Sequence, residues 1–157
     1  MKESAELGSI EGKYHYGKMI LDIISSPKST LNINEVNINI AEDNLRFAAD
    51  NNHLYPKYYY SILLIKFKKN NKKGMELLKE CADNGNCLAM YKYGKKNYKG
   101  YTFINEINKE ILVKNEQIGM QYITNAVHCS LMKAIIFIRL HNIKIETFDS
   151  KLNTSTF

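Results

Sequence analysis

The side chains best suited to acid–base, nucleophilic or metal chemistry are scattered along this chain of 157 residues. The four histidines do not form the i, i+4 pairs that place two metal ligands on one helical face; they are His15, His53, His128 and His141. His128 and Cys129 are adjacent, but neighbours on a helix point in different directions. No HExxH, GxSxG or glycine-rich phosphate-binding motif occurs. We therefore expect no enzymatic activity, no metal site and no cofactor.

The three cysteines, Cys81, Cys87 and Cys129, are odd in number and form no C-x-x-C pair. We interpret them as free thiols buried by packing in a reducing compartment. The N-terminal segment lacks the apolar stretch of a signal peptide, and no window of the sequence approaches a membrane span. These features predict a cytoplasmic protein. Export as an effector, or excision from a larger protein, is the alternative.

Composition is that of a soluble globular protein, with 45% hydrophobic and 24% charged residues. Only two prolines and eight glycines are present, which argues against a turn-dense β-sandwich. The net charge of +6 permits an acidic partner, such as nucleic acid, an anionic membrane or an acidic protein, but it does not choose among them.

One pattern recurs four times along the chain. Pairs of small apolar residues stand just before the expected turns: Ala48-Ala49, Cys81-Ala82 and Ala126-Val127. Three residues later come the turn formers Asn52, Gly85 and Ser130. The copies begin at residues 5, 49, 82 and 127, so their spacings are 44, 33 and 45 residues. Small residues also precede each pair by seven positions, which is two helical turns, and would let a neighbouring helix approach closely: Ala41, Gly74 and Gly119.

Each copy is predicted to form a helix A, a connection and a helix B. Two longer connections, at residues 30–40 and 98–113, explain the wider spacings. The first alternates apolar with polar residues and could form a short strand, but its position between two helices favours an inserted loop. We expect the second to be an insertion of the same kind.

The pattern resembles the Sel-one-like repeat, a relative of the tetratricopeptide repeat. Its best copy is "ADNGNCLAMYKYG" at 82–94, followed by "AELGSIEGKYHYG" at 5–17. The resemblance implies an all-α fold, a right-handed α–α superhelix or solenoid of about three and a half helix-pair repeats with about seven helices. That solenoid would span residues 1–142, with a C-terminal tail or partial cap at 143–157. Helices A would line its concave surface.

Several positions depart from the family pattern. Small residues are replaced at Asn52, Pro56 and Ser61 in the second unit and at Ser130 and Arg139 in the fourth. Pro56 is tolerable if it lies in a first helical turn, where its missing N–H would have no partner. A branch of the family that is exported has cysteines eight residues apart. The six-residue spacing of Cys81 and Cys87 argues against that branch.

The tyrosines fall into two columns, two positions apart in each helix A. The first contains Tyr14, Tyr58 and Tyr91, and the second contains Tyr16, Tyr60 and Tyr93. Two positions on a helix differ by about 200°, so the columns cannot face the same way. Packing between helices is the simplest interpretation of both columns. The alternative for the second column is an aromatic strip on the concave face that contacts a partner.

The lysines form two dense runs, "KFKKNNKK" at 66–73 and "KYGKKNYK" at 92–99. Both runs lie near the connection between helices A and B of adjacent units, so the solenoid would place them along one edge. An ordinary solvated edge is the simpler interpretation, and a basic binding patch is the alternative. The residues of this patch would be Lys68, Lys69, Lys72, Lys95, Lys96 and Lys99.

The leading hypothesis is a non-catalytic protein–protein interaction module, an adaptor or scaffold that binds a peptide or partner protein on the concave helix-A face. The resemblance implies this role, and an extended surface is the usual asset of a solenoid. The alternative is an electrostatic binder of RNA or anionic lipid through the lysine-rich edge. Nucleic acid is not favoured, because Arg46 and Arg139 are the only arginines. A regulatory appendage of a larger enzyme is a third hypothesis. We expect a monomer or a component of a larger complex.

Overall fold

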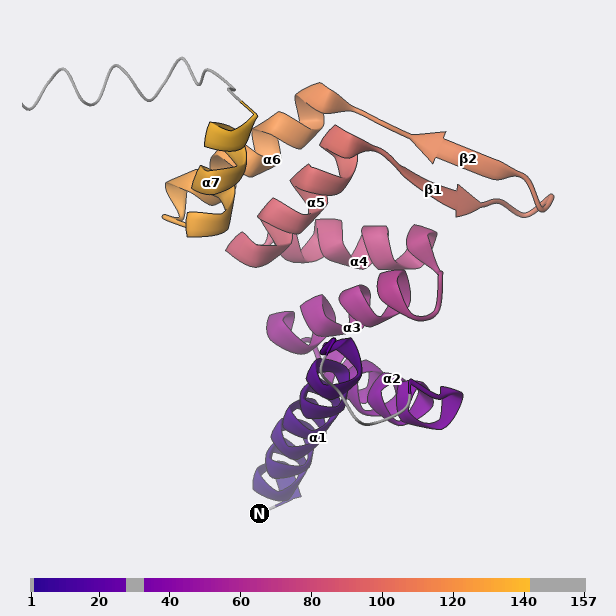
Figure 1. The fold of residues 1–157 in the computed structure, drawn as a ribbon. Helices are drawn as coiled ribbons and strands as arrows, with labels where there is room; N and C mark the ends of the chain where they lie inside the picture. The colour runs from indigo at the N-terminus through magenta and orange to yellow at the C-terminus, as the bar shows by residue number, and fades with distance from the viewer. Residues whose placement is uncertain (1, 28–32, 142–157) are drawn as a thin grey trace, which may run out of the picture.

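The described part of the computed structural model, residues 2–27 and 33–141, is helical apart from one β-hairpin (Figure 1). Its elements are α1 Lys2–Ser25, α2 Glu35–Asp50, α3 Leu54–Lys66, α4 Asn71–Asp83, α5 Cys87–Lys99, β1 Tyr101–Ile104, β2 Glu110–Val113, α6 Glu116–His128 and α7 Met132–Leu140. The all-α class is confirmed in these ranges, and so is the prediction of about seven helices. The expected tail at 143–157 lies outside the described residues. No helix in the described ranges is both long and apolar enough to cross a membrane.

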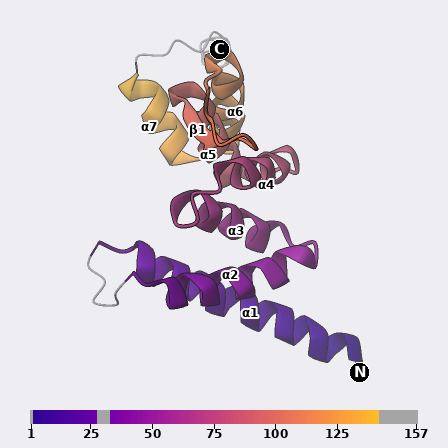
Figure 2. The same cartoon turned by 90° about the vertical axis from the view of Figure 1, so that its right-hand side faces the viewer.

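Consecutive helices pack on one another from α1 at one end of the molecule to α7 near the other (Figures 1 and 2). Helices α1, α3, α5 and α7 correspond to helix A of the four units, and α2, α4 and α6 correspond to helix B of the first three. Helices α3 and α5 have the same length and start 33 residues apart, and α4 and α6 start 45 residues apart. The spacings of 33 and 45 residues found in the sequence are therefore spacings of the helices, whereas α1 and α3, which begin at Lys2 and Leu54, do not show the spacing of 44.

Small residues mark the points where the helices of one pair cross. A Cβ atom added to Gly74 in α4 would lie 2.5 Å from Cγ1 of Ile65 in α3. A Cβ atom on Gly119 in α6 would lie 2.5 Å from the backbone nitrogen of Tyr98 in α5. One on Gly94 would lie 2.7 Å from the carbonyl oxygen of Gly119. The predicted close approach of helices at these positions is confirmed, because a larger side chain would push the pairs apart.

The turns from helix B to the next helix A require a left-handed backbone. Residues Asn52, Gly85 and Ser130 have φ values of 64°, 93° and 59°, respectively. Glycine adopts this conformation without cost, asparagine tolerates it, and serine is strained there. The three residues predicted as turn formers from the sequence therefore all have a positive φ angle.

Asparagine side chains begin four of the described helices. Asn34, Asn70, Asn86 and Asn115 each accept a hydrogen bond from the backbone N–H three residues later. Such a cap satisfies a backbone donor that has no partner within the helix. The abundance of asparagine in this chain therefore has a structural use at helix ends.

Three apolar clusters follow one another along the stack. The first joins α1, α2 and α3 around Leu45 and Leu63, and the second joins α3, α4 and α5 around Leu78. The third lies among α5, α6 and α7 around Ile123 and Phe137. Each cluster covers the apolar faces that a single helix pair would expose, as stacked helix pairs require.

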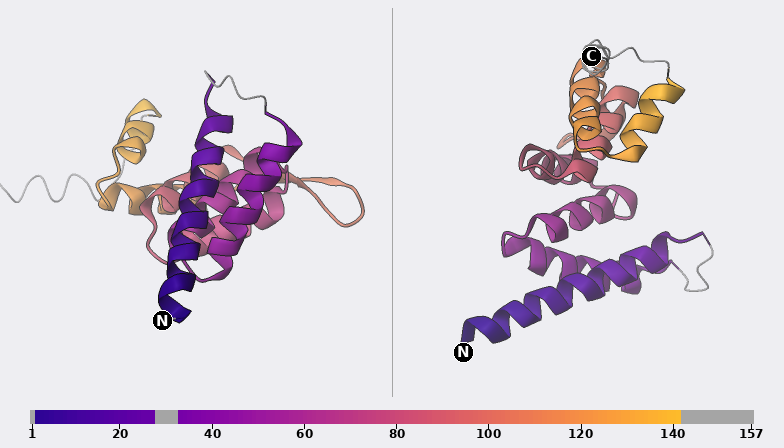
Figure 3. Two further views of the ribbon diagram at one scale, coloured as in Figure 1. Left: turned by 90° about the horizontal axis from the view of Figure 1, so that it is seen from below. Right: turned by 90° about the vertical axis from the view of Figure 1, so that its left-hand side faces the viewer.

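The two long connections differ from the expectation. Helix α2 already begins at Glu35, so neither a loop nor a strand occupies residues 35–40. The connection at 98–113 contains an antiparallel hairpin, in which Tyr101 pairs with Val113 and Ile104 with Glu110. Gly100, with φ 92°, ends α5 and starts the hairpin. The hairpin and α7 extend on opposite sides of the molecule (Figures 1 and 3).

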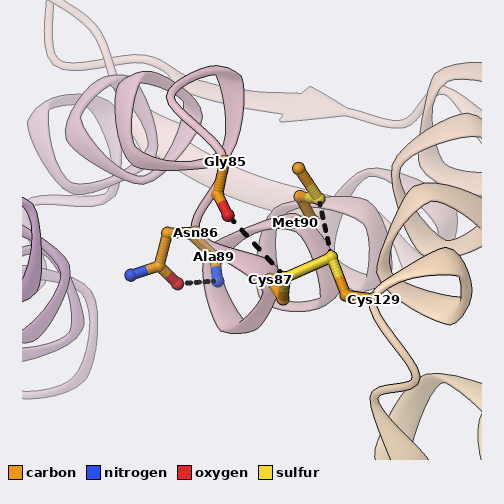
Figure 4. The surroundings of a disulfide bond; sticks show 6 residues. All are labelled: Gly85, Asn86, Cys87, Ala89, Met90 and Cys129. Atoms are coloured by element: carbon orange, nitrogen blue, oxygen red, sulfur yellow. Dashed lines mark hydrogen bonds between the residues drawn. A yellow bond between two sulfur atoms is a disulfide. The ribbon is translucent and has the colours of Figure 1, made fainter.

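A disulfide bond joins Cys87, the first residue of α5, to Cys129, which caps the end of α6 (Figure 4). The two Cα atoms are 6.1 Å apart. The interpretation of all three cysteines as free thiols is therefore wrong for these two, while Cys81 is free and buried. The bonded residues are 42 positions apart in the chain but adjacent in space, because α5 and α6 pack side by side. The bond ties the turn before α7 to the start of α5.

Candidate ligand-binding groove

Helix α5 presents four lysines at the helical spacing i, i+3, i+4 and i+7, which places them on one stripe: Lys92, Lys95, Lys96 and Lys99. Lys66 comes from the last turn of α3, and Lys133 comes from the first turn of α7. All six belong to helices A of successive units. We call these six residues the lysine groove.

The surface of this groove is hollowed in two places. One hollow of about 250 Å³ is lined by three apolar residues and three lysines: Ile62, Ile65, Leu78, Lys66, Lys92 and Lys96. The other, of about 310 Å³, is lined by Tyr91, Lys92, Lys95, Lys96, Lys99 and Gly100. Because Lys92 and Lys96 line both hollows, the two are neighbours and form one depression along α5.

The positive charge of the groove is not compensated by carboxylates. Among the described residues, none of the six lysines has an aspartate or glutamate within ion-pair distance. The Lys92 side chain is exposed to solvent, but the neighbouring side chains partly desolvate its ammonium group, and this desolvation lowers its pKa. The charges of Lys133, Lys95, Lys66 and Lys96 lower this pKa further. The chain therefore holds several ammonium groups close together against their mutual repulsion.

Aromatic rings give some of these lysines a weak partner. The ammonium of Lys95 lies 5.7 Å from the ring centre of Tyr91, and that of Lys99 lies 5.8 Å from the ring centre of Phe137. Lys66 lies 5.4 Å from the ring centre of Phe67. Cation–π contacts at such distances are worth about 0.5–1 kcal/mol at exposed sites, so the lysines keep free capacity for an anion.

The structure divides the predicted basic edge. Lys95, Lys96 and Lys99 lie in the groove, but Lys68 forms an ion pair with Glu42, at 2.9 Å, and so belongs to the packing of α3 on α2. Lys69 is exposed in the turn between α3 and α4, with φ 52°. Lys72 lines a separate hollow beside the hairpin, together with Met75, Glu76, Lys79, Tyr93, Tyr101 and Phe103. Lys68 and Lys72 therefore do not line the two hollows of the groove.

The second tyrosine column does not form an exposed strip. Tyr16 is 45% exposed, whereas Tyr60 and Tyr93 are only 4% and 9% exposed. The ring of Tyr93 packs edge-on against Tyr122, with 4.7 Å between the ring centres. The first column is packed between helices as expected, since Tyr58 and Tyr91 are buried.

Sequence reasoning misses Lys133, because nothing near it in the chain is basic and only the packing of α7 brings it to Lys92. The i, i+3, i+4, i+7 spacing of the α5 lysines can be read from the sequence. This spacing distinguishes the lysines that share one helical face from Lys68 and Lys72, which do not belong to it. Lys66 and Lys92 are the first residues of the two basic runs, although the predicted patch does not include them.

The residue types that bind metals form no metal-ligand cluster in the described part of the chain. No group of three or more histidine, cysteine, aspartate or glutamate side chains converges there. Burial raises the pKa of the Cys81 thiol to about 11, so this cysteine stays protonated near neutral pH. The ring of His141 stacks on Phe137, with 4.1 Å between the ring centres.

Comparisons of this chain with protein-family models, with curated proteins and with solved structures gave no match.

Proposed function

We propose that this chain is a non-catalytic interaction module, in which stacked helix pairs form a right-handed solenoid and the lysine groove holds an acidic segment of a partner protein. The observation that carries the proposal is the uncompensated groove itself, whose hollows are lined by lysines of α3 and α5, with the charge of Lys133 in α7 acting on Lys92. A surface that keeps like charges together costs folding stability, so a ligand that neutralises them gains binding energy.

The shape of the groove supports a peptide ligand. One of its hollows lies between α3, α4 and α5, where the apolar side chains of Ile62, Ile65 and Leu78 line it together with lysines. Peptides bind helical grooves with this combination of apolar contact and flanking charge. The module would act as a monomer or within a larger complex.

Binding of a fluorescein-labelled peptide of alternating glutamate and alanine, measured by fluorescence anisotropy, tests this proposal. We expect the double variant Lys92→Glu with Lys96→Glu to lose at least tenfold in affinity, which is about 1.4 kcal/mol. The matched control is Lys72→Glu with Lys109→Glu, which changes the net charge equally at exposed sites outside the groove. Equal losses in both double variants would show that only net charge matters and would overturn the proposal.

RNA or anionic lipid is the second candidate, and the exposed Lys69, Lys72 and Lys73 beside α4 favour it. Phosphate-backbone binding falls steeply between low and physiological salt. An oligouridylate that binds more tightly than the acidic peptide at physiological salt, and that loses more affinity in Lys72→Glu with Lys109→Glu than in Lys92→Glu with Lys96→Glu, would favour this second candidate.

A further inference from the structure

We propose that the segment held by the lysine groove carries a phosphorylated serine or threonine, whose phosphate lies among Lys66, Lys92 and Lys96. This inference rests on the proposed function, because it names the chemical group that the groove would recognise in its partner.

The number of lysines around Lys92 favours a phosphate over a single carboxylate. Four lysines of three helices act electrostatically on this one ammonium group, and no described carboxylate pairs with any of them. A phosphorylated side chain brings a charge of about −1.5 to −2 and three acceptor oxygens to one point. It can therefore accept hydrogen bonds from several ammonium groups at once, whereas a carboxylate brings one charge.

The residue type agrees with this assignment. The planar guanidinium of arginine forms bidentate hydrogen bonds with a carboxylate, whereas the ammonium group of lysine acts as a compact point charge. The groove contains lysines from three helices and no arginine; Arg139 is exposed on α7 and lines neither hollow. A tetrahedral anion can be surrounded by point charges from different directions without such planar matching.

The neighbouring hollow suits the side chains next to the phosphate. It is lined by Ile62, Ile65 and Leu78 as well as by lysines, and its volume of about 250 Å³ is sufficient for an apolar residue of the bound segment. One peptide could thus place its phosphate against Lys66, Lys92 and Lys96 and an adjacent apolar side chain in the hollow that these lysines line.

Other phosphate-bearing macromolecules fit the groove less well. Single-stranded RNA binding relies on exposed aromatic rings on which bases stack, but Tyr91 and Phe137 beside the groove are buried. An anionic membrane presents a broad surface, whereas Lys92 and Lys96 line hollows between helices. A narrow chain that bears an isolated phosphate can enter such hollows.

The test uses three peptide libraries with degenerate flanking positions and a fixed central phosphoserine, serine or glutamate. Each library is passed over the immobilised full-length chain, and selected peptides are measured by fluorescence anisotropy. We expect phosphoserine peptides to bind at least tenfold more tightly than their serine and glutamate twins. Lys92→Gln and Lys66→Gln should each weaken phosphoserine binding about tenfold, while Lys109→Gln should not change it.

Each alternative result has a defined meaning. Equal binding of the phosphoserine and glutamate twins, lost in Lys92→Glu with Lys96→Glu, would overturn the phosphate assignment and leave the proposed function standing. Absence of groove-dependent binding by any peptide would overturn both. Binding confined to oligouridylate or to phosphatidylserine vesicles would also overturn both and favour the second candidate function.

A competition experiment covers the case in which a variant does not fold. Pyrophosphate should displace a selected phosphoserine peptide from the wild-type chain at concentrations where sulfate at equal ionic strength does not. Equal displacement by the two salts would indicate screening alone and would contradict the inference.

Discussion

The charge of Lys92 lowers the stability of the free folded protein and favours the binding of an anion. Its ammonium is held near Lys133, Lys95, Lys66 and Lys96, and partial desolvation together with these charges lowers its pKa. In the unfolded chain these lysines are separated and solvated. The folded state therefore bears an electrostatic cost that a bound anion removes.

Replacement of this charge should stabilise the free protein. We expect Lys92→Gln to raise the free energy of unfolding by up to about 1 kcal/mol, measured by urea denaturation at neutral pH and low salt. The pKa of Lys92 is lower in the folded protein than in the unfolded chain. Its charge therefore destabilises the folded protein fully at pH values below the folded-state pKa, and this destabilisation disappears as the pH rises through the unfolded-state pKa. The gain of Lys92→Gln over wild type should shrink accordingly at alkaline pH. Lys109→Gln, at an exposed site in the hairpin turn outside the groove, is the control; a destabilised Lys92→Gln protein would contradict this account.

Ser130 is the residue whose backbone strain is easiest to relieve. It occupies the left-handed position, φ 59°, that glycine takes at Gly85 in the preceding turn. We expect Ser130→Gly to raise the free energy of unfolding by about 0.5–1 kcal/mol, and Gly85→Ala to lower it by about 1 kcal/mol. Thermal and chemical denaturation monitored by circular dichroism would measure both changes, and opposite signs would refute the assignment of these turns.

At the scale of elements, the crossing of α5 with α6 depends on two glycines. A Cβ atom on Gly94 would lie 2.7 Å from the carbonyl oxygen of Gly119 and 2.8 Å from Cγ1 of Ile123, so neither helix can keep its place. We expect Gly94→Ala to lower the free energy of unfolding by about 2–3 kcal/mol, as for overpacked cores. Gly12→Ala in α1 is the matched control, because nothing lies within 4 Å of the added atom there. It should raise stability by up to about 1 kcal/mol through helix propensity. Equal effects of the two substitutions, measured by urea denaturation, would show that the crossing is not close.

The small residues and turn residues that recur along the chain show why the helices could be predicted from the sequence and the hairpin could not. Gly74, Gly119 and the positive-φ column are repeated at fixed positions, and repetition separates them from chance. The strands Tyr101–Ile104 and Glu110–Val113 occur once, and four residues each are too few for alternation to be recognised. The groove was predictable only in part, since Lys95, Lys96 and Lys99 share a stripe of one helix but Lys133 joins them through tertiary packing.

At the scale of the whole molecule, the Cys87–Cys129 bond joins α5 to the turn between α6 and α7 and so limits how far the last helix can move. A loop closed over 42 residues lowers the entropy of the unfolded chain. We expect Cys87→Ser with Cys129→Ser to lose about 2–4 kcal/mol of unfolding free energy, and reductant to have the same effect on the wild type. Urea denaturation with and without reductant measures the loss.

The thiol state of the protein also bears on where it works. When the protein is denatured without reductant, a thiol-reactive reagent should detect one free thiol per chain, that of Cys81. Such bonds persist in oxidising compartments and are rare in the cytosol. Three free thiols in protein isolated from its native cell would agree with the cytoplasmic expectation and contradict the bond.

Photo-crosslinking tests the central claim, that the lysine groove holds an acidic segment of a partner, most directly. An acidic peptide that carries a benzoylphenylalanine is irradiated with the full-length chain, and the crosslinked sites are mapped by mass spectrometry. The account predicts crosslinks on α3, α5 and α7 around Ile62, Ile65 and Lys96, which Lys92→Glu with Lys96→Glu abolishes. Crosslinks concentrated on the hairpin or on α2, or unchanged in the double variant, would contradict it.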